Sequence, residues 1–271
     1  MGHMDQPGPF FSVIIPCLNE EKYLPKLLKD LQGQIDRNFE VIVVDGKSED
    51  RTVEVARKFE YSVLEADKKN VSYQRNLGAK NARGKWLVFF DADVRIPANF
   101  LSEVHHYILM NKDCRFLTTW TEPDVRGNGN GAMLLLANLM MEAANDLGNP
   151  MVGVFDMVIE SRVFREVGGY DQEFKMNEDH DLANRLTRAG KKMHILKWPR
   201  LTMSMRRFRR EGTLSVLGKY AVTTLFMITN NPFTKELFDY EMGGKVSAIK
   251  KKKLEESLGR LKSILGGDSL E

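Results

Sequence analysis

Four short runs rich in apolar residues stand out in the first third of the chain. They are Phe11–Ile15, Phe39–Val44, Ser62–Leu64 and Trp86–Phe90. A strand with one solvated face alternates apolar and polar residues, whereas a strand covered on both faces is apolar nearly throughout. The runs therefore predict four strands that are buried on both sides.

Helical periodicity fills the segments between these runs. Apolar residues recur every three or four positions over Glu20–Gln32 and Ser72–Ala82, and in a segment that ends near Phe59. Ser48 is the expected N-cap of this middle helix, because a serine oxygen accepts a hydrogen bond from a free backbone N–H. Alternation of buried strands and helices predicts an α/β/α sandwich with a mainly parallel central sheet.

The remainder of the chain is less regular. We expect helices at Phe100–Met110, Ala132–Asp146 and Glu178–Ala189, strands at Phe116–Trp120 and Met193–Leu196, and a Gly- and Asn-rich loop at Pro123–Gly131. After Lys250–Lys253, leucines recur at helical spacing, which predicts a helical tail. Residues 1–10 are expected to be a tag remnant and a disordered start.

Composition narrows the class of protein. The chain has 271 residues, 42% of them hydrophobic and 28% charged, as in a folded domain with a small extension. A net charge of +3, from 40 basic and 37 acidic residues, argues against a dedicated nucleic-acid binder. Cys17 and Cys114 form no disulfide or metal-ligand pattern, which favours a reducing, cytoplasmic setting. Leu214–Ile228 is too short and polar for a membrane span, and is either a packed helix or a membrane-surface segment.

Carboxylates follow two of the predicted strands. Asp91 and Asp93 lie one residue apart and repel each other unless a cation neutralises them. Mg²⁺ and Mn²⁺ take oxygen ligands of this kind, although a solvated turn is the alternative reading. Asp45 follows the second strand, where it is either a turn residue or an acceptor for a ribose hydroxyl or a base N–H.

Two further clusters carry charge. The segment Asn177–Leu182 places three acidic residues and a histidine at the start of a predicted helix. Helix capping explains one of them, and a carboxylate held there in a cleft suits proton removal from a hydroxyl. Arg206–Arg210 is a basic cluster that suits phosphate binding, a solvated face, or a membrane or nucleic-acid patch.

Taken together, these segments resemble the family 2 glycosyltransferases of the GT-A fold. The similarity rests on six motifs in order, which are Val13–Glu21, Val41–Gly46, Gln74–Ala79, Phe89–Asp93, Gly168–Asp171 and Glu178–Leu182. It extends over residues 11–210, as a catalytic domain with a nucleotide-binding half at 11–98 and an acceptor-binding half at 99–210. Residues 211–271 would be a helical C-terminal extension.

The resemblance implies transfer of a sugar, with inversion, from a nucleotide-diphosphate sugar to an acceptor. Asp179 would be the general base, with Glu178 and Asp181 shaping its surroundings. Asp93, with Asp91, would hold a divalent Mn or Mg ion through this Asp-X-Asp motif. The residues implied in nucleotide binding are Pro16, Leu18, Glu20, Asp45, Arg75, Asp91, Ala92 and Arg206.

The partners follow from the same resemblance. The donor would be UDP- or GDP-linked, and the acceptor a glycan or a lipid-linked molecule, in polysaccharide or glycolipid biosynthesis. Met133–Met141 either faces a lipid acceptor or is core. Contact of the C-terminal tail with the inner face of a membrane, and a homodimer, both stay open.

The sequence leaves two alternatives to the transferase. A nucleotidyltransferase would carry a Gly-rich, basic loop after the first strand, and Pro16–Glu21 has neither feature. A non-catalytic, membrane-associated scaffold that binds sugar nucleotides would not need Asp93 and Asp179.

Overall fold

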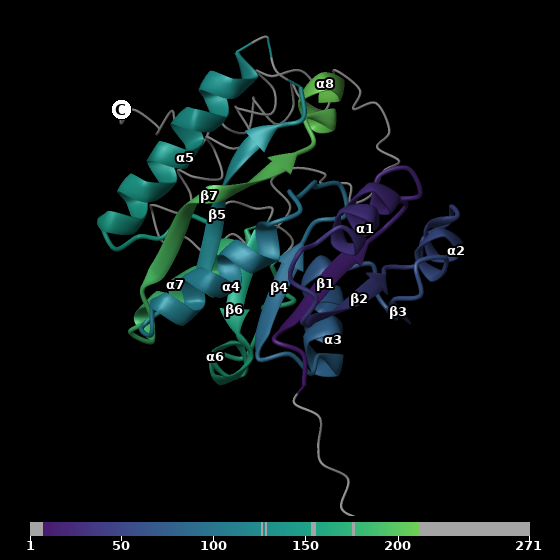
Figure 1. Ribbon diagram of the computed structural model, residues 1–271, viewed down its shortest axis with the longest axis horizontal. Helices are drawn as coiled ribbons and strands as arrows, with labels where there is room; N and C mark the ends of the chain where they lie inside the picture. Colours follow the sequence, from purple (N-terminus) through teal and green to yellow (C-terminus); the bar gives the residue numbers. More distant parts are fainter. Residues whose placement is uncertain (1–7, 126, 128, 153–155, 175–176, 212–271) are drawn as a thin grey trace, which may run out of the picture. The chain divides into compact units, whose positions relative to one another are not determined.

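The computed structural model describes residues 8–125, 127, 129–152, 156–174 and 177–211 (Figure 1). Residues 1–7 of the start predicted at 1–10, and the C-terminal tail from residue 212, lie outside the described residues. The chain divides into two compact units, residues 1–205 and 206–271. Of the second unit, only the helix α8 (Arg206–Glu211) is described.

One seven-stranded sheet runs through the described part of the first unit, in the order β3-β2-β1-β4-β6-β5-β7. The strands are β1 (Phe11–Cys17), β2 (Phe39–Asp45), β3 (Ser62–Glu65), β4 (Trp86–Phe90), β5 (Phe116–Pro123), β6 (Asp156–Glu160) and β7 (Met193–Met203). Only β6 runs antiparallel to its neighbours, β4 and β5. The predicted, mainly parallel sheet is confirmed.

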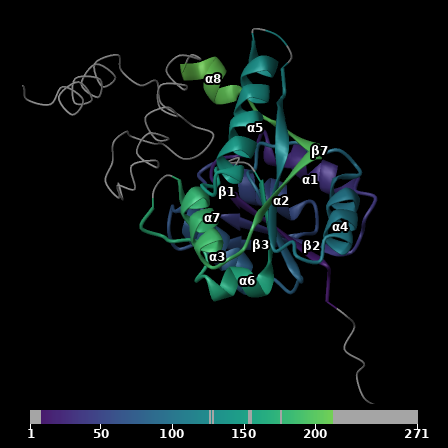
Figure 2. The same cartoon turned by 90° about the vertical axis from the view of Figure 1, so that its left-hand side faces the viewer.

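Helices cover both faces of the sheet. Their bounds are α1 (Leu24–Gln32), α2 (Thr52–Arg57), α3 (Val71–Asn81), α4 (Phe100–Met110), α5 (Asn130–Asp146), α6 (Ser161–Glu166) and α7 (Glu178–Arg188). Figure 2 shows α1 and α4 on one side of the sheet and α3, α6 and α7 on the other. Successive residues of β4 point to opposite faces, so that Phe90 packs on Phe100 of α4 and Phe89 packs on Phe164 of α6.

The central strands are buried as their composition requires. Every residue of β1 and of β4 is buried. Helix α3 comes unusually close to β1, because a Cβ added at Gly78 would lie 2.4 Å from Cγ2 of Ile14. The glycine thus sets the distance between this helix and the sheet.

Several boundaries differ from the prediction. Ser48 does not cap α2, which begins at Thr52, because the Ser48 hydroxyl accepts the backbone N–H of Asn19 instead. The strand β6 was not predicted, since its five residues pass directly into α6 without a turn residue. β7 extends from Met193 to Met203, well beyond its short predicted run, because it pairs with β5 again over Leu201–Met203 after a shift in register.

Helix α5 exposes much of its apolar surface. Leu134 and Met141 are buried, but Leu135, Leu136, Leu139 and Met140 are exposed. The reading of Met133–Met141 as simple core is therefore wrong for these four side chains. Among the residues that the structure describes, no helix is long and apolar enough to cross a membrane.

The close approach at Gly78 gives a stability prediction. Gly78→Ala is expected to destabilise the protein by about 1–3 kcal/mol, because the overpacking at Ile14 outweighs the better helix propensity of alanine. Gly131→Ala in α5 is the matched control, since a Cβ there meets no atom within 4 Å. Urea denaturation measures both variants. A Gly78→Ala variant as stable as Gly131→Ala would contradict the close packing.

Candidate active site

The carboxyl ends of the parallel strands gather most of the predicted site. Asp45 ends β2, opposite Cys17 at the end of β1, and Asp91 follows β4 directly. Asp91 also lies within hydrogen-bonding distance of Arg75 on α3, which contacts the first turn of α7 as well. Segments that are far apart in the sequence thus meet at one edge of the sheet.

The loops after β1 and β2 are tied together around Asp45. Asn19 donates its backbone N–H to the Ser48 hydroxyl at 2.8 Å, and its side-chain oxygen accepts the backbone N–H of Glu49 at 2.8 Å. Glu20 donates its backbone N–H to Thr52 Oγ1 at 2.7 Å. The Asp45 carboxylate accepts the backbone N–H of Ser48 at 2.9 Å. These contacts hold two adjacent loops as one rigid platform.

Gln74 supports this platform from below, a role that the sequence reasoning missed. Its Nε2 donates to the backbone carbonyls of Cys17 at 2.9 Å and of Val44 at 2.7 Å. The amide therefore fixes the spacing between the ends of β1 and β2. Pro16 lies inside β1, opposite Val44, and Leu18 begins the loop that follows.

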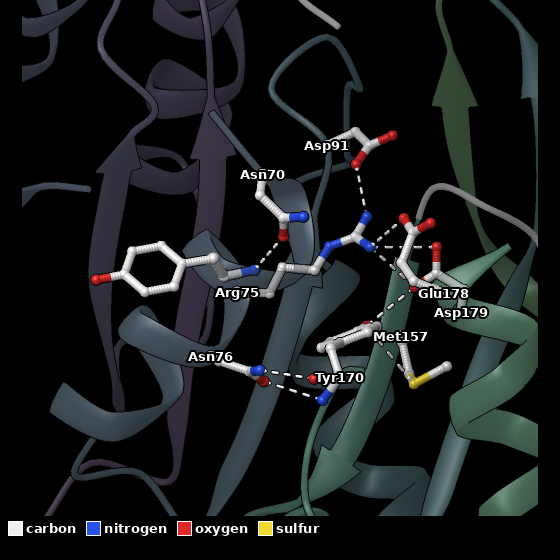
Figure 3. A network of polar contacts seen from close by, with 9 residues as sticks. Asn70, Arg75, Asn76, Asp91, Met157, Tyr170, Glu178 and Asp179 are labelled. Carbon is white, nitrogen blue, oxygen red and sulfur yellow. Dashed lines mark hydrogen bonds and ion pairs between the residues drawn. The ribbon is translucent and has the colours of Figure 1, made fainter. Parts of the chain in front are cut away.

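Arg75 is the centre of a buried ion cluster (Figure 3). Its Nη1 donates to Glu178 at 2.8 Å and to Asp179 Oδ1 at 3.2 Å, and its Nη2 donates to Asp91 at 3.0 Å. The arginine is 3% exposed. The guanidinium thus joins the end of β4 to the start of α7, and three predicted site carboxylates meet on one cation.

The charges in this cluster do not balance. Burial raises the pKa of Asp91 to about 7, against the opposing effect of Arg75. Because 29% of the Asp91 side chain is exposed, water weakens this effect. Burial also raises the pKa values of Glu178 and Asp179, which lie at the start of α7. One guanidinium cannot offset three carboxylates, so the site favours a proton or a further cation.

A tyrosine that the predictions left out of the site contacts the proposed base. Tyr170 Oη donates to Asp179 Oδ1 at 3.0 Å, and its ring lies 5.0 Å from the Arg75 guanidinium carbon. Gly168 and Gly169, both at positive φ, form the turn that precedes it. The Gly-Gly-Tyr motif was the signal for this residue, but its spacing does not reveal the partner.

Asp156, at the start of β6, is a buried carboxylate that the sequence did not predict as part of the site. It is 3% exposed, accepts the Thr118 hydroxyl at 2.9 Å and accepts the backbone N–H of Thr119 at 3.0 Å. Burial raises its pKa to about 7. Because β6 was not predicted from the sequence, Asp156 was not expected at the edge of the sheet.

The remaining predicted residues stand as follows. Asp93 lies close enough to Asp91 to raise the pKa of that carboxyl. Asp181 pairs with Arg185 on its own helix at 2.7 Å. Arg206 is the first residue of α8 and belongs to the second unit. Within the described ranges, no group of three His, Cys, Asp or Glu side chains is arranged to hold a metal.

The fold matches solved glycosyltransferases. A mannosyltransferase from Pyrobaculum calidifontis, solved with GDP-Man and Mn²⁺, superposes with a TM-score of 0.63 at 15% identity, over 97% of this chain and 77% of that one. TarS of Staphylococcus aureus with UDP-GlcNAc gives a TM-score of 0.58 at 21% identity, over 72% of this chain and 58% of that one. The predicted GT-A fold is confirmed.

The family follows from the sequence match. Residues 12–146 match the model described as glycosyl transferase family 2, and the chain belongs to this family of enzymes. An uncharacterised glycosyltransferase of Haemophilus influenzae is 28% identical over 190 residues, which is 65% of this chain and 61% of the relative.

A second relative carries a more specific description. The dolichyl N-acetyl-alpha-D-glucosaminyl phosphate 3-beta-D-2,3-diacetamido-2,3-dideoxy-beta-D-glucuronosyltransferase of Methanococcus voltae is 26% identical over 217 residues, which is 68% of this chain and 64% of the relative. The chain therefore spans somewhat less than two thirds of the length of either relative.

The charge imbalance around Arg75 yields a second prediction. Arg75→Met is expected to destabilise the protein by about 3–5 kcal/mol at neutral pH, because it leaves three carboxylates without their common cation. Without the guanidinium, the carboxyls hold their protons to higher pH in the folded state than in the unfolded state. The loss in free energy of unfolding caused by Arg75→Met should therefore shrink as the pH falls toward 5 and grow as it rises toward 8.

Urea denaturation at several pH values measures this dependence. Arg162→Met is the matched control, because Arg162 pairs with Glu166 on the surface with 78% of its side chain exposed. That variant should lose little stability at any pH. A loss for Arg75→Met that is small, or independent of pH, would contradict the cluster.

Proposed function

We propose that this protein transfers a sugar from a nucleotide-diphosphate sugar to an acceptor hydroxyl, with inversion and with Asp179 as the general base. The observation that carries the proposal is the guanidinium shared by Asp91 and Asp179. It holds a carboxylate of the strand-end edge, where nucleotides bind in such sheets, beside a carboxylate at a helix N-terminus. Family membership supports the reaction class.

Asp45 is proposed to select the donor base. One of its oxygens is held by the Ser48 N–H, and the residue is 3% exposed, so its orientation is fixed. A carboxylate only accepts hydrogen bonds, and uracil and guanine carry a ring N–H that adenine and cytosine lack. Relatives in fold were solved with UDP-GlcNAc and with GDP-Man, which supports a UDP- or GDP-linked donor. The platform residues Pro16, Leu18 and Glu20 would line the same nucleotide.

Asp179 is proposed to remove the proton from the acceptor hydroxyl as that oxygen attacks the sugar. Burial raises the pKa of Asp179, which makes its carboxylate a stronger base. Arg75 keeps enough of the carboxylate ionised to act, since the guanidinium opposes the effect of burial. Attack from the side opposite the departing nucleotide gives inversion. Glu178 shares the same guanidinium and would shape the approach to the base.

Asp93 and Asp91, on either side of Ala92, are proposed to hold a divalent cation together with the donor diphosphate. The excess of carboxylates over cations around Arg75 fits such an ion, and Mg²⁺ and Mn²⁺ often complete their shell with substrate phosphates. Bound there, the ion would offset the charge that develops on the leaving nucleoside diphosphate.

The acceptor is proposed to be a glycan or a lipid-linked molecule, handled at the inner face of the membrane. The dolichyl phosphate in the description of the Methanococcus relative, and the exposed leucines of α5, support the lipid-linked case. Synthesis of a glycolipid or a polysaccharide would follow.

The base role gives the principal test. Asp179→Asn is expected to lower kcat by about 10²–10⁴-fold, because the amide cannot take the proton. Release of UDP or GDP from a panel of nucleotide sugars, with Mn²⁺ and with EDTA, measures turnover. Calorimetric donor binding should stay within a few-fold of the original protein, and Asp113→Asn, an exposed carboxylate, is the control. Full turnover in Asp179→Asn removes this residue from the base role.

Base selection gives a separate test. Asp45→Asn is expected to weaken UDP and GDP binding by about tenfold or more, because the acceptor for the ring N–H becomes an amide that also donates. CDP, whose cytosine offers an acceptor nitrogen, should lose less affinity or gain some. Titration calorimetry with the three nucleotides measures the change. Equal losses for all three would show that Asp45 does not read the base.

A further inference from the structure

We propose that Tyr170 is a positioning residue for Asp179, whose carboxylate it orients and keeps ionised so that Oδ2 is the oxygen that takes the acceptor proton. This inference rests on the proposed role of Asp179 as the base. The sequence motifs do not assign a role to Tyr170. In this inference the hydroxyl of Tyr170, rather than its ring, acts on Asp179.

The phenol is fixed along its whole length. Asn76 on α3 donates to the Tyr170 carbonyl at 2.7 Å and accepts the Tyr170 backbone N–H at 2.9 Å (Figure 3). The ring packs edge-on against Phe89 and against Phe164, with centroid distances of 5.2 and 5.7 Å. The residue is 2% exposed. Backbone and ring are therefore held without any help from the hydroxyl.

The hydroxyl has one strong partner. It lies 3.0 Å from Asp179 Oδ1 and 3.9 Å from the sulfur of Met157. A single O–H proton is donated to the carboxylate in preference to a thioether, because charge-assisted hydrogen bonds are the stronger ones. Burial beside Asp179 raises the pKa of Tyr170 well above its usual value, so the phenol keeps this proton.

The two oxygens of Asp179 are held unequally. Oδ1 accepts from Tyr170 at 3.0 Å and from Arg75 Nη1 at 3.2 Å. Of the contacts among the described residues, Oδ2 has the long one to the same Nη1, at 3.3 Å. Two donors on Oδ1 fix the plane of the carboxylate and leave Oδ2 the more available lone pairs. Oδ2 is thus the oxygen that faces the acceptor.

Because several carboxyls lie near Asp179, the Tyr170 hydroxyl has a large effect on the ionisation of that residue. Among the residues that the structure describes, the groups that interact with it are Arg75 of α3, Asp156 of β6, Glu178 of α7, Asp91 after β4, and Tyr170 itself. Three of these five are carboxyls, which disfavour its ionised form, so Arg75 and Tyr170 are the two of the five that favour it. Loss of the hydroxyl therefore leaves Asp179 protonated up to a higher pH.

Tyr170→Phe tests the proposal, because it removes only the oxygen. The acid limb of the pH profile of kcat/KM is expected to move to higher pH, with activity about tenfold below that of the original protein on that limb, since one pH unit is tenfold in ionisation. Donor affinity should stay within about twofold. Tyr170→3-fluorotyrosine, whose hydroxyl is a stronger hydrogen-bond donor, should move the acid limb to lower pH.

Tyr107→Phe is the matched control. It removes a hydroxyl bonded to His194 at 2.8 Å, and neither residue is among the groups that interact with Asp179. Its pH profile should coincide with that of the original protein. A merely structural role for Tyr170 would lower activity equally at all pH values, and an acid limb left in place by both Tyr170 variants overturns the inference.

A readout without turnover separates this inference from the proposed function. The carboxyl carbon of Asp179, labelled with ¹³C and assigned by its absence in Asp179→Asn, reports ionisation directly by NMR. Its titration midpoint should rise in Tyr170→Phe. A raised midpoint in a protein that transfers no sugar would refute the proposed function alone, whereas an unchanged midpoint in an active protein would refute the role of Tyr170 alone.

Discussion

A single buried guanidinium holds the candidate site together. Arg75 meets Asp91 at the end of β4 and both Glu178 and Asp179 at the start of α7. Buried charges persist only where they are paired, so each of these carboxylates depends on the arginine, and the arginine depends on them. The pairing also joins the early βαβ part of the chain to its later helices. The site can form only when both parts have folded.

Three consecutive residues of α3 divide the work of building this edge of the sheet. Successive helical residues point about 100° apart. Gln74 reaches the ends of β1 and β2, Arg75 reaches the carboxylates, and Asn76 holds the backbone of Tyr170. Gly78, one turn further along, lets the helix approach the sheet closely enough for these short reaches. One helix thus sets the position of the rigid platform around Asp45 and of the proposed base.

The sequence predicts the first half of the fold well because its strands are covered on both faces, which leaves continuous apolar runs such as Trp86–Phe90. It fails where a tertiary partner overrides a local signal. Ser48 has the chemistry of an N-cap, but its hydroxyl is taken by Asn19. β6 has no turn residue to mark its end. The site carboxylates could be predicted from motifs, whereas Tyr170 and Asp156 could not, because no spacing rule reveals which distant carboxylate or threonine a buried side chain will meet.

The shared guanidinium has a thermodynamic consequence. Asp91 and Asp179 both pair with the guanidinium of Arg75. A ligand that neutralises Asp91 therefore lets Arg75 stabilise the ionised form of Asp179 more strongly. The readiness of the proposed base, Asp179, to accept a proton and the occupancy of the proposed donor site at Asp91 are then coupled. Such coupling is reciprocal, because an acceptor that engages Asp179 must change the affinity at Asp91 by the same factor. The affinities for donor and acceptor would therefore be coupled through the side chain of Arg75, without any movement of the backbone.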